Sequence, residues 1–133
     1  MAWLLDTNIL IAVSRKRPGL RSRLAALSAG DILLSSVVLA EIEYGIAKSE
    51  RRERNRAVYD ALLKAFAMVD FDAAAARHYG AIRLDLERRG EIVGPNDLMI
   101  AAHARSLNAV LVTDNTVEFA RVGGLELENW LQA

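Results

Sequence analysis

Four acidic residues stand where the sequence could concentrate chemistry. Asp6 and Asp114 each come at or just after the end of a short apolar run, and Glu41 and Asp97 lie near the starts of two expected helices. Carboxylate oxygens with no neighbouring His or Cys suit Mg²⁺ or Mn²⁺. An ion held this way lowers the pKa of a bound water, positions it for in-line attack and offsets charge at a phosphate. These are the requirements of phosphodiester cleavage.

The elements that must position these acids alternate along the whole chain. The strands are expected at residues 3–5, 32–34, 68–69, 110–112 and 125–128. Helical patterns are expected at residues 9–13, 20–29, 37–46, 57–67 and 73–89, and from the turn at 94–96 to residue 107, with a short one after 116. Continuously apolar strands between helices predict a mostly parallel sheet covered on both faces. The fold class is therefore α/β, with three layers and about five central strands.

The carboxyl edge of such a sheet gathers the strand ends and the following helix starts, so the four acids are predicted to converge there. Each acid alone has a plain structural explanation. Asp6 and Asp97 would favour a helix dipole, Glu41 would be a surface residue, and Asp114 would belong to a turn. Together, however, crowded carboxylates repel one another unless a cation lies between them, which favours a metal site.

Polar residues before the expected helices predict where those helices begin. Asp6 or Thr7 is expected to cap the first helix, and Ser36 is expected to cap the helix that carries Glu41. Asp72 has the same role before the long helix at 73–89. The helix starts thus fall beside the predicted edge.

The composition excludes several classes of protein. A chain of 133 residues fits one domain with a core of its own. Seventeen basic residues balance seventeen acidic ones, so there is no overall attraction to nucleic acid. The absence of cysteine excludes disulfides, thiolate zinc sites and cysteine nucleophiles. No secretory pattern and no apolar run of about 18 residues is present, so we expect a cytoplasmic protein with no membrane partner.

Four segments together resemble one family. They are Leu5–Asn8, Ser36–Gly45, Gly94–Ala102 and Val112–Trp130. In order and spacing they are similar to PIN-domain proteins, and in particular to the VapC toxins of type II toxin–antitoxin modules. The resemblance implies a single PIN domain over residues 1–133 with a PIN-like fold. It also implies a metal-dependent endoribonuclease that acts as the toxin of a toxin–antitoxin pair.

The resemblance also assigns roles to residues. Asp6, Glu41, Asp97 and Asp114 would form the catalytic pocket, and Asp6 and Asp97 would bind the Mg²⁺ or Mn²⁺ directly. The polar residues expected to support these acids are Thr7, Asn8, Thr113, Asn115 and Glu118.

The expected partners are an RNA substrate, a second copy in a homodimer, and a cognate VapB-like antitoxin, with a higher assembly when the antitoxin is bound. The candidate antitoxin groove comprises Tyr44, Ile46, Val58 and Leu62, although at least some of them would serve equally as core. Candidate RNA contacts are Arg15, Lys16 and Arg17, for which simple solvation is the alternative.

Other functions fit the residues less well. A phosphatase of the haloacid dehalogenase type would need an acid at position 8, where Asn8 stands. A receiver domain would need a Lys after the strand that ends near Asp114. A non-catalytic PIN-like module that binds RNA or protein remains the alternative, but it has no need of crowded carboxylates. His78 and His103 are expected to be structural, and Trp3 and Trp130 to be packing residues.

Overall fold

Five strands form one parallel sheet in the computed structural model, which describes residues 1–131. The strands are β1 (Trp3–Leu5), β2 (Ile32–Ser35), β3 (Ala67–Val69), β4 (Val110–Val112) and β5 (Leu127–Glu128). Their order across the sheet is β3-β2-β1-β4-β5, and every described pairing is parallel. This confirms the predicted sheet. Because β1 is central, the residue that follows it leaves from the middle of the carboxyl edge.

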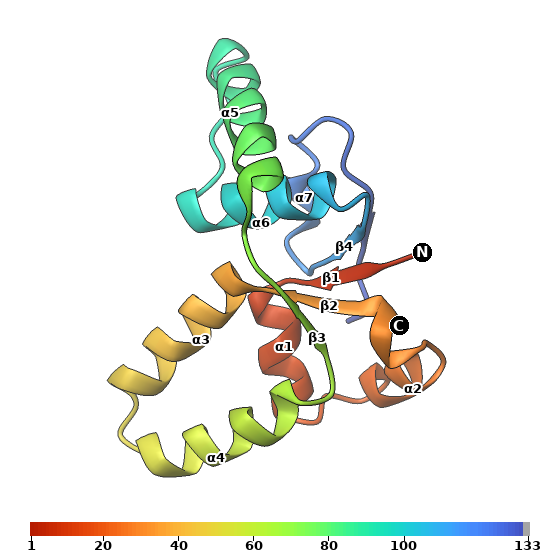
Figure 1. The fold of residues 1–133 in the computed structure, drawn as a ribbon, viewed down its shortest axis with the longest axis vertical. Coiled ribbons are helices and arrows are strands. Elements are labelled where there is room, and N and C mark those ends of the chain that lie inside the picture. The colour runs from red at the N-terminus through yellow and green to blue at the C-terminus, as the bar shows by residue number, and fades with distance from the viewer. Residues whose placement is uncertain (132–133) are drawn as a thin grey trace.

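Helices cover both faces of this sheet. They are α1 (Thr7–Ser14), α2 (Leu20–Ala25), α3 (Ser36–Lys48), α4 (Arg52–Leu63), α5 (Ala73–Arg88), α6 (Pro95–Ser106) and α7 (Thr116–Phe119). Figure 1 shows α5, α6 and α7 on one side of the strands and α1 to α4 on the other, which gives the three predicted layers. Within residues 1–131, no helix combines the length and apolar character that crossing a membrane requires.

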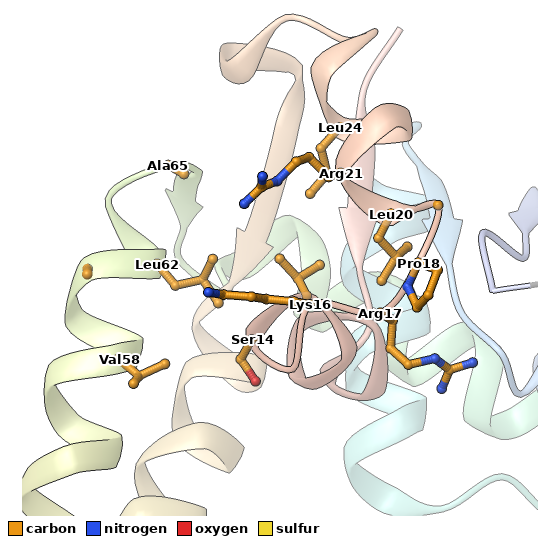
Figure 2. A pocket seen from close by; sticks show the side chains of 13 residues that line it. Ser14, Lys16, Arg17, Pro18, Leu20, Arg21, Leu24, Val58, Leu62 and Ala65 are labelled. Atoms are coloured by element: carbon orange, nitrogen blue, oxygen red, sulfur yellow. The ribbon is translucent and has the colours of Figure 1, made fainter.

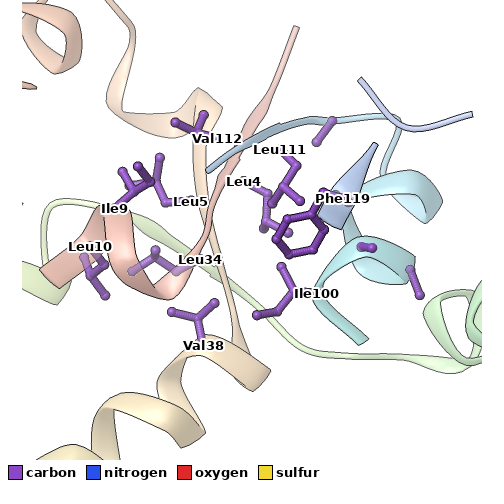
Figure 3. Packing of buried hydrophobic residues seen from close by; sticks show 14 of the residues in the cluster. Leu4, Leu5, Ile9, Leu10, Leu34, Val38, Ile100, Leu111, Val112 and Phe119 are labelled. Atoms are coloured by element: carbon purple, nitrogen blue, oxygen red, sulfur yellow. The ribbon is translucent and has the colours of Figure 1, made fainter. Parts of the chain in front are cut away.

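The core lies in two layers because neighbouring strand residues point to opposite faces. Leu4 faces Phe119 of α7, whereas Leu5 lies on the other side of the sheet, with Ile9 of α1 and Val38 of α3 (Figure 3). All five side chains are fully buried. Burial of a side chain of this size contributes about 1.5–3 kcal/mol, so the strands are held firmly and their polar ends have fixed places.

Two of the predicted helix caps are confirmed. The Oδ1 atom of Asp6 accepts a hydrogen bond of 2.7 Å from the backbone N–H of Thr7 at the start of α1. Asp72 accepts one of 3.0 Å from the N–H of Ala75 in α5. Each bond satisfies an N–H that has no partner inside its own helix.

The predicted cap of α3 is wrong by one residue. Ser35 is the N-cap, and its hydroxyl accepts a hydrogen bond of 3.1 Å from the N–H of Val37. Ser36 is the first residue of the helix instead, and its hydroxyl accepts the N–H of Phe71 at 2.9 Å. The difference arises because β2 is one residue longer than the apolar run and pairs Ser35 with Val69.

The helices α3 and α4 form a hairpin that extends away from the strands (Figure 1). No residue of α4 is buried. Arg56 of α4 binds both carboxylate oxygens of Glu43 of α3, at 2.7 and 2.6 Å, and so ties the two helices together. The charged stretch around residues 48–56 is therefore an exposed turn and helix start, as its composition predicts.

Candidate active site

Asp6 is the most enclosed acid of the carboxyl edge, with 4% of its surface exposed. Besides the bond from the Thr7 backbone, its Oδ2 atom accepts a hydrogen bond of 2.8 Å from the hydroxyl of Thr113, just after β4. Burial raises the pKa of Asp6, and the nearby charges of Glu41 and Asp114 raise it further, while the two hydrogen bonds lower it. The carboxylate is thus firmly oriented in surroundings that disfavour its charge.

Glu41 reaches the same edge from α3. Its Oε1 atom accepts a hydrogen bond of 2.7 Å from the hydroxyl of Thr7. Thr7 therefore contacts two of the predicted catalytic acids, since its backbone N–H binds Asp6 and its side chain binds Glu41. The resemblance to PIN-domain proteins implies such a supporting position for Thr7.

Asp97 lies in the first turn of α6. Burial raises the pKa of Asp97 to about 6, and the charges of Asp6, Glu118 and Glu41 add to the increase. Every charged group that shifts this pKa is an acid. The surroundings of Asp97 therefore disfavour its negative charge.

Glu118 of α7 differs from Asp97 although both lie near Gly94. A Cβ at position 94 would be 3.8 Å from Oε1 of Glu118 and 4.0 Å from Oδ2 of Asp97. The backbone N–H of Gly94 donates to Glu118 at 2.8 Å, and the side-chain amide of Asn115 donates at 2.7 Å. These bonds, that of Gly94 first, lower the pKa of Glu118. Glu118 thus fastens α7 to the start of α6.

The remaining predicted site residues are more open. Asp114 is exposed, but it lies near enough to raise the pKa of Asp6. Asn8 is also exposed. The hydroxyl of Thr113 accepts the N–H of Asn115 at 3.0 Å, which holds the loop after β4. The predicted acids therefore share one edge, with Asp6 enclosed and Asp114 at its rim.

The acids do not form a ready-made metal site. Within the described part of the chain, no three Asp, Glu or His side chains stand where one ion would bind them all. The arrangement is a looser cluster, in which Asp6, Glu41, Asp97 and Glu118 act on one another through their charges. The donor set is made of hard oxygen atoms, the chemistry that Mg²⁺ and Mn²⁺ prefer.

A groove lies beside α1, α2 and α4, with a cavity volume of about 810 Å³. We call it the α1–α4 groove, and the side chains that line it include Val13, Leu20, Leu24, Val58 and Leu62, with the cations Lys16, Arg17 and Arg21. Figure 2 shows Lys16 and Arg21 reaching toward α4, whereas Arg17 points away from it. The groove therefore combines an apolar lining with positive charge.

The predicted antitoxin groove is partly corrected by this geometry. Val58 and Leu62 line the α1–α4 groove. Ile46 does not, because it is 4% exposed and belongs to the core. Tyr44 is 67% exposed on α3 and lies outside the groove lining.

Three further predictions concern basic and aromatic residues. Arg15, Lys16 and Arg17 are all exposed after α1, as contacts to RNA would require. Trp130 is 4% exposed and packs in the core, which confirms its expected role. Trp3 packs against the core while partly buried, also as expected.

Sequence reasoning missed two contributors to the site. Gly94 supplies the backbone N–H that holds Glu118, although the residues are 24 positions apart. Leu24 lines the groove, and only its place in a helical segment after Lys16 offered a signal. Backbone donors and long-range partners of this kind leave no pattern in the sequence.

Comparison with known proteins gives a consistent match over the chain. The family model described as PIN domain matches residues 3–125. A Shigella flexneri protein named tRNA(fMet)-specific endonuclease VapC is 46% identical over 130 residues, which is 98% of each chain. Ribonuclease VapC2 of Rickettsia felis is 43% identical over 132 residues, again 98% of each.

Solved structures agree with the sequence matches. The structure of VapBC2 from Rickettsia felis bound to a promoter DNA fragment superposes with a TM-score of 0.92 and 42% identity, covering 98% of this chain and 99% of that one. DNA-bound VapBC from Salmonella typhimurium gives a TM-score of 0.93 at 39% identity and covers 98% of both chains. The likeness therefore extends from sequence to the arrangement of all the main elements.

Proposed function

This chain belongs to the PIN domain family, and we propose that it is a VapC-type endoribonuclease, dependent on Mg²⁺ or Mn²⁺, that acts as a toxin. Support comes from its similarity over nearly its full length to proteins named VapC ribonucleases. The observation that carries the proposal is the gathering of Asp6, Glu41 and Asp97 at one edge, where burial and neighbouring acids raise the pKa of Asp97 to about 6. A site with that much uncompensated negative charge is suited to a divalent cation.

The ion would be held by Asp6 and Asp97. Both carboxylates have raised pKa values, so a positive charge between them would remove an unfavourable interaction. Glu41 and Asp114 would complete the pocket, Glu41 from its bond to Thr7 and Asp114 from the rim. When bound there, the cation would stabilise the charge that develops on a phosphate as its diester bond is broken.

The other residues would prepare this edge for an RNA phosphate. Thr113 and Thr7 fix the orientation of Asp6, so that little rearrangement is needed when substrate arrives. Arg15, Lys16 and Arg17 would contact the RNA backbone from the end of α1. A purely binding module would gain nothing from holding acids near RNA phosphates, which repel them.

We further propose that a VapB-like antitoxin binds this chain and that the α1–α4 groove receives part of it. The solved relatives include VapBC structures from Rickettsia felis and Salmonella typhimurium. The groove's apolar lining beside Lys16 and Arg21 suits an amphipathic segment that carries acidic side chains. Assembly of the toxin as a homodimer is part of the same proposal.

The experiment that tests the proposed activity is cleavage of purified total RNA. We expect cleavage in the presence of Mg²⁺ or Mn²⁺ and none after addition of a chelator. Asp6→Asn, which keeps the size of the side chain, should remove cleavage while the circular dichroism spectrum stays unchanged. Undiminished cleavage by this variant, or by wild type in chelator, would contradict the assignment.

A further inference from the structure

A buried hydrogen bond joins the helix of Glu41 to the helix of Asp97. The hydroxyl of Ser35, the cap of α3, lies 2.8 Å from Nδ1 of His103 in α6. Both side chains are fully buried, with no exposed surface. The bond spans 68 residues of sequence. It is therefore a tertiary connection between two elements of the active edge.

His103 contributes this hydrogen bond and little else that is polar. In residues 1–131, its Nε2 atom is buried without a hydrogen-bond partner. Burial lowers the pKa of His103 and so favours the neutral ring. Its edge-to-face contact with Phe71, at 5.6 Å between ring centres, would be available to an apolar side chain as well. A buried nitrogen without a partner costs stability, so the Nε2 atom gives no reason for a histidine at this position. The bond from Nδ1 to Ser35 is what an apolar side chain could not provide.

Ser35 is held from its own side as well. The hydroxyl of Ser35 accepts a hydrogen bond from the N–H of Val37 and also bonds to His103. The same group therefore caps α3 and connects it to α6. The next residue, Ser36, binds the N–H of Phe71, the residue whose ring packs on His103. The start of α3 is thus fixed relative to α6 by directed bonds as well as by apolar packing.

We propose that Ser35 and His103 are positioning residues, whose hydrogen bond sets the angle between α3 and α6 and thereby the spacing of Glu41 and Asp97. The proposal rests on the function proposed above. Glu41 lies six residues after Ser35, and Asp97 lies six residues before His103. Six helical residues span about 9 Å, so a tilt of about 10° at the connection displaces an acid by roughly 1.5 Å. Displacements of about 1 Å at a reacting centre reduce rates by as much as about 100-fold.

The first test compares cleavage by variants that remove or keep the bond. His103→Leu removes it and fills the space, whereas His103→Asn places an amide where Nδ1 stood. We expect His103→Leu to lower kcat about tenfold with KM changed less than twofold, and His103→Asn to recover most of the loss. Ser35→Ala should lower kcat to a similar extent, and Ser35→Thr, which keeps the hydroxyl, should remain near wild type. In the double variant of His103→Leu and Ser35→Ala, kcat should fall no further than in either single variant.

Ser36→Ala is the matched control for general damage to the start of α3. It removes a neighbouring hydroxyl that binds Phe71 but not His103. We expect a lower Tm and a kcat within twofold of wild type. If Ser36→Ala reduces kcat as much as Ser35→Ala does, or if His103→Leu and Ser35→Ala retain full kcat, the proposal is wrong. If His103→Leu does not fold, His103→Phe decides, because it keeps a ring of similar size without the nitrogen, whereas Ser35→Ala also removes the cap bond to Val37.

The second test does not depend on activity. The chain has no cysteine, so Ala47→Cys on α3 and Asn96→Cys on α6 would carry the only two spin labels, both at exposed positions. We expect the distance distribution between the labels to shift or broaden in Ser35→Ala and to remain unchanged in Ser36→Ala. An unchanged distribution in Ser35→Ala overturns the proposal. Absence of cleavage by wild type would instead refute the proposed function, and the label distances would still test the connection.

Discussion

The carboxylate edge and the α1–α4 groove lie in one small domain but are built in opposite ways. At the edge, Asp6 is buried and both its oxygens accept hydrogen bonds from residues anchored by the sheet. In the groove, Val58 is 41% exposed on a helix with no buried residue, and Lys16 is exposed. The edge is organised before any ligand arrives, whereas the groove presents a surface that a partner would complete.

The comparison continues within the edge itself. Asp97 and Glu118 both lie near Gly94, yet the pKa of Asp97 is raised to about 6 and that of Glu118 is lowered. The difference arises from hydrogen-bond donors. Glu118 accepts bonds from the backbone N–H of Gly94 and the side-chain amide of Asn115, whereas the charged groups around Asp97 are acids. The donors therefore fix Glu118 in a structural role, whereas the charge of Asp97 is left for a bound cation to compensate.

The largest expected effect separates the edge from the groove. Asp97→Asn should lower RNA cleavage at least about 1,000-fold, because it removes a predicted metal ligand. Binding of the cognate antitoxin, measured by calorimetry, should change less than about threefold if the groove is the main contact. Equal losses of RNA cleavage and of antitoxin binding would show that the carboxylate edge and the groove do not act separately.

The converse substitution is Val58→Asp in the groove. This substitution removes an apolar contact and places an unpaired charge against an apolar partner. It should therefore weaken antitoxin binding at least about tenfold. Cleavage of RNA by the free toxin should stay within twofold of wild type. Tyr44→Ala is the matched control on α3, outside the groove lining, and should weaken antitoxin binding by less than twofold. If Tyr44→Ala weakened antitoxin binding more than Val58→Asp does, the antitoxin would bind outside the α1–α4 groove and the proposal for the groove would be wrong.

A smaller effect is expected from the hydroxyl that orients Asp6. Thr113→Val keeps the shape of the side chain but removes the 2.8 Å bond to Oδ2. We expect kcat for RNA cleavage to fall about tenfold, with the protein folded. Thr116→Val, on α7 and without a bond to the proposed catalytic acids, is the control and should leave kcat unchanged. An unaffected kcat in Thr113→Val would mean that this bond does not prepare the edge.

The smallest effect concerns stability and its dependence on pH. Since the pKa of Asp97 is about 6 in the folded protein against an ordinary 3.8, the folded state binds this proton more tightly. Its contribution to stability is therefore full below pH 3.8 and is lost as the pH rises through 6. In metal-free protein at pH 7.5, Asp97→Asn should increase the free energy of unfolding by about 1 kcal/mol, after allowance for solvent screening. The difference from wild type should vanish below about pH 4.

Glu118→Gln should show the opposite sign. The lowered pKa of Glu118 stabilises the fold above its ordinary pKa, and this contribution is lost as the pH falls through the folded value. The variant should therefore be less stable than wild type at pH 7.5 and approach it in acid. Urea unfolding at a series of pH values measures both variants. If Asp97→Asn and Glu118→Gln changed the free energy of unfolding at pH 7.5 in the same direction, the contrast between the two acids would be wrong.

The sequence predicts the sheet and the edge well for a physical reason. Apolar runs that end in a polar residue mark buried strands, so β1, β4 and the cap at Asp6 follow from local pattern alone. The cap of α3 does not follow from local pattern. Ser35 and Ser36 are both suitable caps, and the pairing of Ser35 with Val69 in the sheet determines that Ser35 takes this place. Ile46 shows a second limit, since helical spacing does not reveal which apolar face meets the core. The partner of His103 is beyond reach because it lies 68 residues away.

The most direct test of the central claim is titration of the metal-free protein with Mn²⁺, followed by calorimetry and by RNA cleavage in the same samples. We predict that wild type binds Mn²⁺, that cleavage rises in step with occupancy, and that Asp97→Asn weakens binding at least tenfold. Binding of equal strength in Asp97→Asn, or cleavage at full rate before any Mn²⁺ is bound, would contradict the assignment of this edge as a metal-dependent active site.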